Sequence, residues 1–307
     1  MSSQRPPAVS PRHVVELLLL GALWGASFLF MRVGAPEFGP IPLIGVRVAV
    51  AAAFLLLVLL ARGQLPALVA HPRRRELFWL GVLNSALPFC LFAFAALGIT
   101  AGLNAILNST APMWTALVAF VWLRQRPTAG GLLGLLLGIV GVVVLVSGRG
   151  GPGGMSGSLA AIAAGLLASL CYGLGVVYTK QRLASESPWL VAAATQCAAT
   201  LVLAPLAIWL WPEQPISAAA WASVIALGIA STGLAYILYF QLILAIGPAR
   251  AVTVTLLIPI FASLWGTLLL DEAVTPRMLL GGGIVLLGTA LATGLLGPLR
   301  RAAAQSE

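Results

Sequence analysis

Amide side chains inside a strongly apolar stretch of the chain are the first residues that could do chemistry. Asn104 and Asn108 lie one helical turn apart, and Thr115 falls on the same face two turns further on. An amide offers both donor and acceptor groups, so these residues are suited to binding a polar solute in apolar surroundings. Amides also tie neighbouring membrane helices together by hydrogen bonds. The sequence leaves both interpretations open.

Aromatic and amide side chains mark two further apolar stretches. Asn84 stands in one of them, and Tyr236 and Tyr239 stand in the other, spaced to face one way. Tyrosine combines a flat apolar ring with a hydroxyl group, so it can hold an amphipathic solute. An aromatic belt at a membrane surface is the alternative, but Tyr236 lies too near the middle of its stretch for that. We therefore predict that these residues line a cavity.

Other polar and aromatic residues are scattered over the remaining apolar stretches. Each is a weak signal alone, because Ser and Thr can bond back to the carbonyls of their own helix. Only their meeting in one cavity would make a site. The whole predicted substrate-binding set is Trp24, Ser27, Asn84, Asn104, Asn108, Trp114, Tyr172, Tyr178, Gln196, Tyr236, Tyr239 and Thr253.

Arg47 is the one charge placed well inside an apolar stretch, on the order of 10 Å from its nearer end at about 1.5 Å per residue. An anionic solute could contact it. We favour the interpretation that its long stem carries the guanidinium outward to Glu37 or to lipid headgroups. No acidic residue is expected at mid-membrane, which weakens the case for proton exchange through a carboxylate.

Prolines interrupt two apolar stretches, at Pro112 and Pro259. A proline inside a helix removes a backbone hydrogen bond and kinks it. Paired interruptions in corresponding parts of a chain point to a binding region and to bending during gating, so we predict a hinge at each. A static kink is the alternative.

Catalytic and metal-binding chemistry is not indicated. Cys90, Cys171 and Cys197 have no paired spacing, and His13 and His71 lie in polar flanks. A membrane-embedded lipid-modifying enzyme would need a nucleophile with a base, or a metal cluster. We predict no catalytic residue, no metal and no cofactor, and we do not expect an enzyme.

The composition requires an all-α integral membrane protein. Apolar residues make up 60% of the chain and charged residues only 8%, and the mean hydropathy is +1.04. At ~20 apolar residues per crossing, we predict ten transmembrane helices: Val14 to Gly34, Pro40 to Ala61, Leu77 to Leu97, Ala101 to Leu123, Gly131 to Val146, Gly157 to Tyr178, Trp189 to Trp211, Ala218 to Phe240, Ala249 to Leu270 and Met278 to Leu295.

The chain carries the same module twice, at an offset of about 147 to 148 residues. Trp24 recurs as Tyr172, and Arg32 recurs as Lys180. Each copy has an odd number of predicted crossings, so the second copy must be inverted relative to the first, as in many secondary transporters. We predict a first repeat over 14–146, a glycine-rich linker over 147–156 and an inverted second repeat over 157–295.

The distribution of basic residues predicts the orientation in the membrane, and so does not suggest a nucleic-acid partner. Basic residues stay on the cytoplasmic side during insertion, so both termini are expected inside, and attraction to anionic lipids of the bilayer follows as a side effect. The cytoplasmic set, from a total of 17 basic residues, is Arg5, Arg12, Arg62, Arg73, Arg74, Arg75, Arg124, Arg126, Lys180, Arg182, Arg250, Arg300 and Arg301.

Glycines at helical spacing mark the fifth and tenth crossings, including Gly134 and Gly141 in one and Gly281 and Gly288 in the other. Small residues let two helix backbones approach closely, so these are expected to be packing helices. The glycines do not say whether the contact lies within one chain or between two. We favour a monomer and leave a homodimer open.

Motifs in both halves resemble those of the drug/metabolite transporter superfamily, in the branch built from two EamA domains. The resemblance covers about Val14 to Leu295. Gln125 departs from the family pattern, because the first copy often has there the glutamate that Glu272 matches. The motifs are Leu23-Trp24-Gly25-Ala26-Ser27-Phe28, Arg32, Arg47, Pro112, Gly134 and Gly141, then Ser231-Thr232-Gly233-Leu234-Ala235-Tyr236, Ile258-Pro259, Leu270-Asp271-Glu272 and Gly281 to Gly288.

The resemblance implies alternating access through a central cavity lined by the first, third, fourth, sixth, eighth and ninth helices, and export of small metabolites, commonly amino acids. We expect a bacterial-type inner-membrane exporter whose small-molecule substrate is an aromatic or other neutral amino acid or a similar metabolite. Facilitated movement is favoured because the mid-membrane carboxylate is missing. A drug or nucleotide-sugar carrier of the same fold, with or without proton coupling, is the alternative.

Overall fold

The computed structural model describes residues 10–147 and 156–295, and within these ranges the chain is helical with no strand. The first half forms α1 (Pro11–Phe38), α2 (Pro40–Ala61), α3 (Leu65–Val69), α4 (Arg74–Gly81), η1 (Val82–Ala86), α5 (Leu87–Gly98), α6 (Ala101–Asn108), α7 (Ala111–Leu123) and α8 (Ala129–Val146). The second half forms α9 (Ser156–Arg182), α10 (Pro188–Trp209), α11 (Ala218–Gly228), η2 (Ile229–Leu234), α12 (Ala235–Ile246), α13 (Pro248–Ala251), α14 (Val254–Leu270) and α15 (Pro276–Ala292).

Most of the predicted crossings appear as helices long and apolar enough to span a bilayer. Eight described helices, some of them built from consecutive segments, meet that requirement by length and composition. The apolar helices α14 and α15 are shorter, at 17 residues each. Large apolar side chains such as Leu201, Ile208 and Leu244 are more than two-thirds exposed on the outside of the bundle, where lipid would cover them. The protein is therefore a multi-pass membrane protein.

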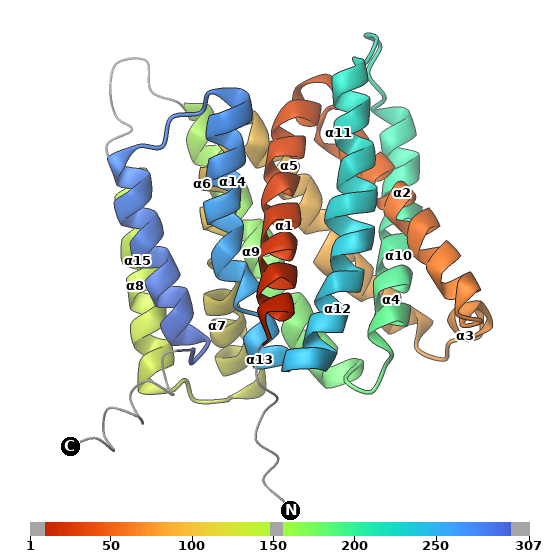
Figure 1. Cartoon of the computed structure of the whole chain (residues 1–307), viewed down its shortest axis with the longest axis horizontal. Helices are drawn as coiled ribbons and strands as arrows, with labels where there is room; N and C mark the ends of the chain where they lie inside the picture. The colour runs from red at the N-terminus through yellow and green to blue at the C-terminus, as the bar shows by residue number, and fades with distance from the viewer. Residues whose placement is uncertain (1–9, 148–155, 296–307) are drawn as a thin grey trace, which may run out of the picture.

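The two halves run in opposite directions. Figure 1 shows α1 rising from the end of the bundle where the chain begins, whereas α9 descends toward that same end. Irregular features recur in the same order: a π-helical segment begins at Val82 and again at Ile229, and left-handed residues end α7 at Arg124 and α14 at Asp271. The predicted linker lies outside the described residues, apart from positions 147 and 156.

The two halves pack against each other through equivalent pairs of helices. Helix α1 packs on α14, and α9 packs on α7, while α2 packs on α10. Helices α8 and α15 pack on each other at the edge of the bundle (Figure 1). A Cβ at Gly134 would lie 2.5 Å from the carbonyl oxygen of Gly288, so these backbones touch. The glycine faces of the predicted packing helices therefore meet within one chain.

Short caps fix the turns between helices. The side chain of Thr128 accepts a hydrogen bond from the backbone of Gly131 at the start of α8, and Thr275 does the same from Met278 at the start of α15. Each such cap contributes about 1 kcal/mol to helix stability. The helices α8 and α15 therefore begin with the same kind of threonine cap at equivalent positions of the two copies.

The two ends of the bundle differ in charge. We name them after residues that lie there: the Lys180 end, where α1 begins and α9 ends, and the Glu272 end, where α1 and α14 end (Figure 1). The described members of the predicted cytoplasmic basic set flank helix ends at the Lys180 end. Glu37, Asp271 and Glu272 lie at the opposite end. This distribution is the one on which the orientation prediction depends.

Candidate substrate-binding cavity

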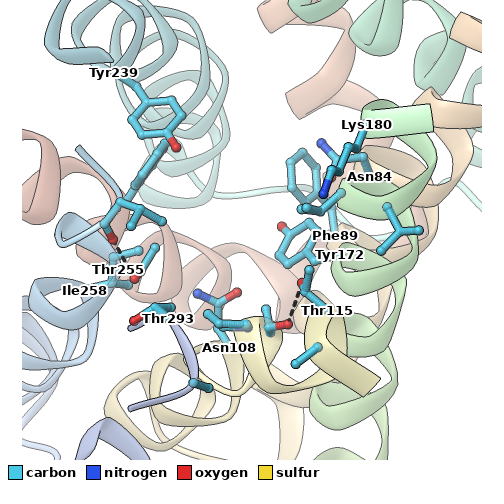
Figure 2. Close-up of a pocket in the computed structure, with 18 of the residues that line it drawn as sticks. Asn84, Phe89, Asn108, Thr115, Tyr172, Lys180, Tyr239, Thr255, Ile258 and Thr293 are labelled. Carbon is cyan, nitrogen blue, oxygen red and sulfur yellow. Dashed lines mark hydrogen bonds between the residues drawn. The ribbon is translucent and has the colours of Figure 1, made fainter. Parts of the chain in front are cut away.

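A cavity of about 640 Å³ lies between the two halves. Both copies contribute to its lining. The lining residues come from α1, α2, η1, α5, α6, α7, α9, η2, α12 and α14, and from the end of α15 at Ala292. Figure 2 shows labelled side chains, among them Asn108, Tyr172 and Tyr239, around a hollow centre. Its volume suits a small organic molecule of the size that protein pockets commonly bind.

Many of the residues predicted from sequence meet in this cavity. They come from six different crossings, which sequence spacing alone could not bring together. The predicted residues that line the cavity are Trp24, Ser27, Arg47, Asn84, Asn108, Pro112, Tyr172, Tyr236 and Tyr239.

Two predicted amides instead lie in the packing between helices. Asn104 is fully buried and donates its Nδ2 hydrogen bond to the carbonyl of Phe92, at 2.9 Å, which joins α6 to α5. Gln196 is fully buried and donates to the hydroxyl of Ser85, at 2.9 Å, which joins α10 to η1. For these two amides the geometry is that of the helix-tying interpretation.

Four other predicted residues also lie away from the lining. Trp114 packs its backbone and Cβ against Gly173, where α7 touches α9. Tyr178 faces a separate small pocket with Arg75 and Arg182 at the Lys180 end. Thr253 donates its hydroxyl hydrogen bond to the carbonyl of Arg250, within its own turn.

Pro259, the fourth, lies inside an unbroken α14, whereas Pro112 stands in the first turn of α7, directly after the break at Ser109 and Thr110. Only Pro112 therefore accompanies a helix break, and a hinge at each proline stays a prediction. In the second half the helix is interrupted earlier, at Val252 and Thr253, between α13 and α14. Pro259 cannot donate to the carbonyl of Thr255, four residues before it, and that carbonyl instead accepts from the hydroxyl of Ser109 in the first half, at 3.4 Å.

Two π-helical segments, which sequence patterns did not predict, place polar groups along the cavity. Asn84 lies in η1, and Ser231 and Thr232 lie in η2, at the matching place of the second copy. A π-helical turn inserts one extra residue and often occurs at functional sites. The apolar periodicity of a helix does not reveal this insertion, although the repeat relates the two segments.

Aromatic rings make up much of the wall. The rings of Trp24 and Tyr239 lie 5.1 Å apart between centroids, which joins α1 to α12. Phe89 meets Tyr172 edge to face at 6.5 Å, which joins α5 to α9. Phe89 could not be singled out from the sequence, because a cavity-lining phenylalanine in an apolar stretch looks the same as a lipid-facing one. The wall can accommodate a flat apolar solute by ring contacts.

Arg47 faces the cavity, so the favoured prediction that it reaches outward to Glu37 was wrong. Its side chain is only 5% exposed, and its Nε donates to the hydroxyl oxygen of Thr232 at 3.2 Å. Its guanidinium carbon lies 3.7 Å from the centroid of the Phe89 ring. Glu37 instead accepts hydrogen bonds from the backbone and hydroxyl of Ser217. The ring and the Thr232 hydroxyl hold the arginine inward.

The cavity reaches the surface at the Lys180 end. Its lining includes Lys180 and Gln125, both exposed there. On α9 the lining runs from Tyr172 to Lys180, and on α7 it continues to Leu123, so it follows the halves of these helices nearer that end. The sequence predicted Lys180 as a member of the cytoplasmic basic set and as the repeat mate of Arg32, but not as a residue that lines the cavity.

An ion pair closes the Glu272 end. The Nε of Arg32 lies 3.2 Å from a carboxylate oxygen of Glu272, and its Nη1 donates to the carbonyl of Ala96 at 2.9 Å. The other Glu272 oxygen accepts from the backbone N–H of Ala101 at 2.9 Å. We call Arg32, Ala96, Ala101 and Glu272 the outer clamp. It ties α1, α5 and α6 to the end of α14.

Metal chemistry has no evident place among the described residues. Within 10–147 and 156–295, no three His, Cys, Asp or Glu side chains lie close enough together to hold a metal ion. The cysteines at 90, 171 and 197 are free thiols. The polar groups of the cavity are thus amides, hydroxyls and two cations, which can bind and release a solute by hydrogen bonds and charge.

Comparison with known proteins places this arrangement in a broader group. The model of the EamA-like transporter family matches the chain twice, over residues 14–147 and 159–294. An uncharacterized transporter of Archaeoglobus fulgidus is 24% identical over 282 residues, covering 89% of this chain and 96% of that protein. The uncharacterized transporter YoaV of Bacillus subtilis is 21% identical over 290 residues, covering 90% and 94%.

A solved crystal structure also shares the fold. It superposes with a TM-score of 0.65 at 20% sequence identity, and the match covers 95% of this chain and 99% of that one.

Proposed function

This chain belongs to the EamA-like transporter family, and on that premise we propose that it exports small amphipathic metabolites, amino acids among them, by alternating access through the central cavity. The observation that carries the proposal is the cavity between the two inverted halves, lined by rings and polar groups and open at one end. Aromatic and other neutral amino acids fit the apolar wall, and the Asn84 and Asn108 amides can bond their polar parts.

We propose a bacterial-type inner membrane as the location, with both termini in the cytoplasm. The excess of basic residues at the Lys180 end supports this orientation. The cavity then opens toward the cytoplasm, from which an exporter takes its solute. A single chain holds both halves of the cavity, which supports a monomer as the working unit.

Movement down the solute gradient is the mechanism we favour. Among the described residues that line the cavity, none is an Asp or Glu that could carry a proton across. Closing the Lys180 end and opening the outer clamp would expose the same cavity to the other side, which is the rocking motion of inverted repeats.

Uptake into liposomes containing the purified chain tests the proposal. A panel of radiolabelled amino acids and related metabolites should include at least one that enters faster than into empty liposomes, with and without a pH gradient. A solute that moves only with the gradient would contradict the facilitated mechanism. Movement of no solute in the panel would contradict the export function itself.

Asn108→Ala and Tyr236→Ala should lower transport while leaving the melting temperature of the purified protein near the parent value. Gln196→Ala is the matched control for packing, because that amide binds Ser85 outside the cavity. It should lower the melting temperature more than the two cavity variants do.

A further inference from the structure

Arg47 is a buried cation in the cavity wall without an acidic partner. Within residues 10–147 and 156–295, no carboxylate forms an ion pair with Arg47. Arg32 in the outer clamp, by contrast, is paired with Glu272. A guanidinium stays protonated at physiological pH. An unneutralised charge at membrane depth is costly and marks a functional site by default.

Most of the Arg47 donors are available to a ligand. The Nε group donates to Thr232, and Nη1 lies 3.9 Å from the sulfur of Met31, a weak acceptor. A guanidinium carries five N–H donors in a planar fork, so three have no protein acceptor in the described part of the chain. That fork matches the two oxygens of a carboxylate.

The second copy has no charged residue at the position equivalent to Arg47. Helices α2 and α10 align from Pro40 with Pro188 to Ala61 with Trp209, which sets Arg47 opposite Thr195. Thr195 is buried and donates its hydroxyl hydrogen bond to the carbonyl of Ala192 in its own helix. The helix packing in the second copy therefore does not require a charged side chain at this position.

The cavity as a whole carries positive charge. Lys180 at the mouth is the second cation of the lining, and no Asp or Glu lies among the described lining residues. A carboxylate would thus find Arg47, whereas an ammonium group would find no opposite charge. Apolar surface from Trp24, Phe28 and Phe89 surrounds this position.

We propose that Arg47 binds the carboxylate of the solute, and that the preferred solutes are apolar organic monoanions without an ammonium group. This rests on the proposed transport function and specifies the substrate class within it. The carboxylate lies in the fork of Arg47, and the apolar part lies against the aromatic wall. Lys180 raises the local concentration of anions at the mouth.

Calorimetric titration of the detergent-purified full chain tests the charge preference without any substitution. The probes share one ring and a three-carbon chain: 3-phenylpropionate is an anion, phenylalanine a zwitterion, 3-phenylpropan-1-ol is neutral, and 3-phenylpropan-1-amine is a cation. We expect 3-phenylpropionate to bind at least tenfold more tightly than each of the others. Binding of the alcohol or of phenylalanine as tight as that of the acid would overturn the proposal.

Arg47→Gln tests the residue itself, and Arg62→Gln is its matched control. Arg62 follows the end of the same helix, stacks on Trp189 and lies outside the cavity lining. Arg47→Gln should weaken binding of 3-phenylpropionate at least tenfold and leave binding of the alcohol unchanged, while Arg62→Gln should change neither. Equal loss for the acid and the alcohol would overturn the assignment.

Thr232→Val is a second variant, which keeps the Arg47 charge and answers the concern that the first variant folds poorly. It removes the hydroxyl that accepts from Arg47 and that donates to the carbonyl of Leu227 in its own helix. A loss of a few-fold at most is expected for 3-phenylpropionate. A tenfold loss for the acid and the alcohol alike would contradict a binding role specific to the guanidinium.

Transport assays separate the two levels of the argument. If the parent chain and Arg47→Gln move phenylalanine and 3-phenylpropionate at equal rates into liposomes, the inference fails and the transport function stands. If neither protein moves any solute of the panel, the proposed function fails as well.

Discussion

The two ends of the bundle are built from equivalent positions, but among the described residues only the Glu272 end carries an ion pair at these positions. The backbone N–H of Gln125 donates to the carbonyl of Ala119 at 3.3 Å, and that of Glu272 donates to Gly266 at 3.1 Å, each after a left-handed residue with φ of 53°. At the Glu272 end the carboxylate pairs with Arg32. At the Lys180 end the same place holds an amide, and no ion pair engages Lys180 within the described residues.

A small neighbour accompanies this difference. A Cβ at Gly266 would lie 2.5 Å from a Glu272 carboxylate oxygen, so the glycine leaves room for the carboxylate. Its counterpart is Ala119, whose methyl group lines the cavity. The comparison teaches that the duplicated helices give both ends the same backbone geometry, whereas the side chains at these two positions decide which end carries an ion pair.

Breaking the outer clamp should give the largest effect. Glu272→Gln removes a charge-assisted pair worth about 1–3 kcal/mol, which would change the ratio of open to closed states roughly 5- to 150-fold. Labelling of a cysteine introduced by Ser27→Cys, in a chain freed of its native cysteines, should become faster from the Glu272 end. Gln125→Ala is the control and should leave the rate unchanged. An unaltered rate in Glu272→Gln would show that the pair does not hold this end closed.

Building the missing clamp should give the next largest effect. Ala119→Gly with Gln125→Glu supplies both the room and the carboxylate opposite Lys180. Labelling of a cysteine introduced by Thr115→Cys should slow several-fold from the Lys180 end, because a new pair of about 1 kcal/mol would favour closure. Gln125→Glu alone should slow it less. Equal rates in the parent and the double variant would contradict the equivalence of the two ends.

The glycine seam offers a smaller asymmetry. Gly134→Ala meets backbone atoms of α15, at 2.5 Å from the Gly288 oxygen, whereas its mate Gly281→Ala first meets the flexible side chain of Leu145 at 2.7 Å. We expect Gly134→Ala to destabilise by about 1–3 kcal/mol and Gly281→Ala by less, as a lower melting temperature. Gly283→Ala, with open space around it, should be neutral or stabilising. The reverse order would show that the seam is loose.

The caps should give the smallest effect, and an equal one. Thr128→Ala and Thr275→Ala each remove one side-chain cap and should each cost about 1 kcal/mol in thermal unfolding of the purified protein. Serine at either position should restore stability. A loss confined to one helix would mean that the edge helices differ in more than sequence.

Much of the architecture could be predicted from the sequence, because a bilayer imposes a strong rule on apolar stretches. The apolar stretches, the two copies and the packing role of Gly134 and Gly288 all follow from periodicity. The π-helical segments η1 and η2 could not be predicted from the sequence, because one inserted residue leaves the apolar pattern almost unchanged.

The cavity was only partly predictable, since polarity shows which residues avoid lipid and not what they contact. Asn108 and Asn104 share a helical face, yet Asn108 lines the cavity and Asn104 bonds to Phe92. Arg47 was assigned the wrong direction because its length allows either. Its environment is set by Thr232, far away in sequence, and only the folded chain brings them together.

The unequal helix lengths have a consequence for the surrounding lipid. Helix α15 has 17 residues and α8 has 18, about 26 Å each, whereas α1 has 28 residues and reaches about 42 Å. Since the short pair lies together at one edge, a bilayer of about 30 Å must thin beside it even when both helices stand upright. We therefore expect the bilayer to be thinner, and shorter acyl chains to be enriched, along the α8–α15 edge.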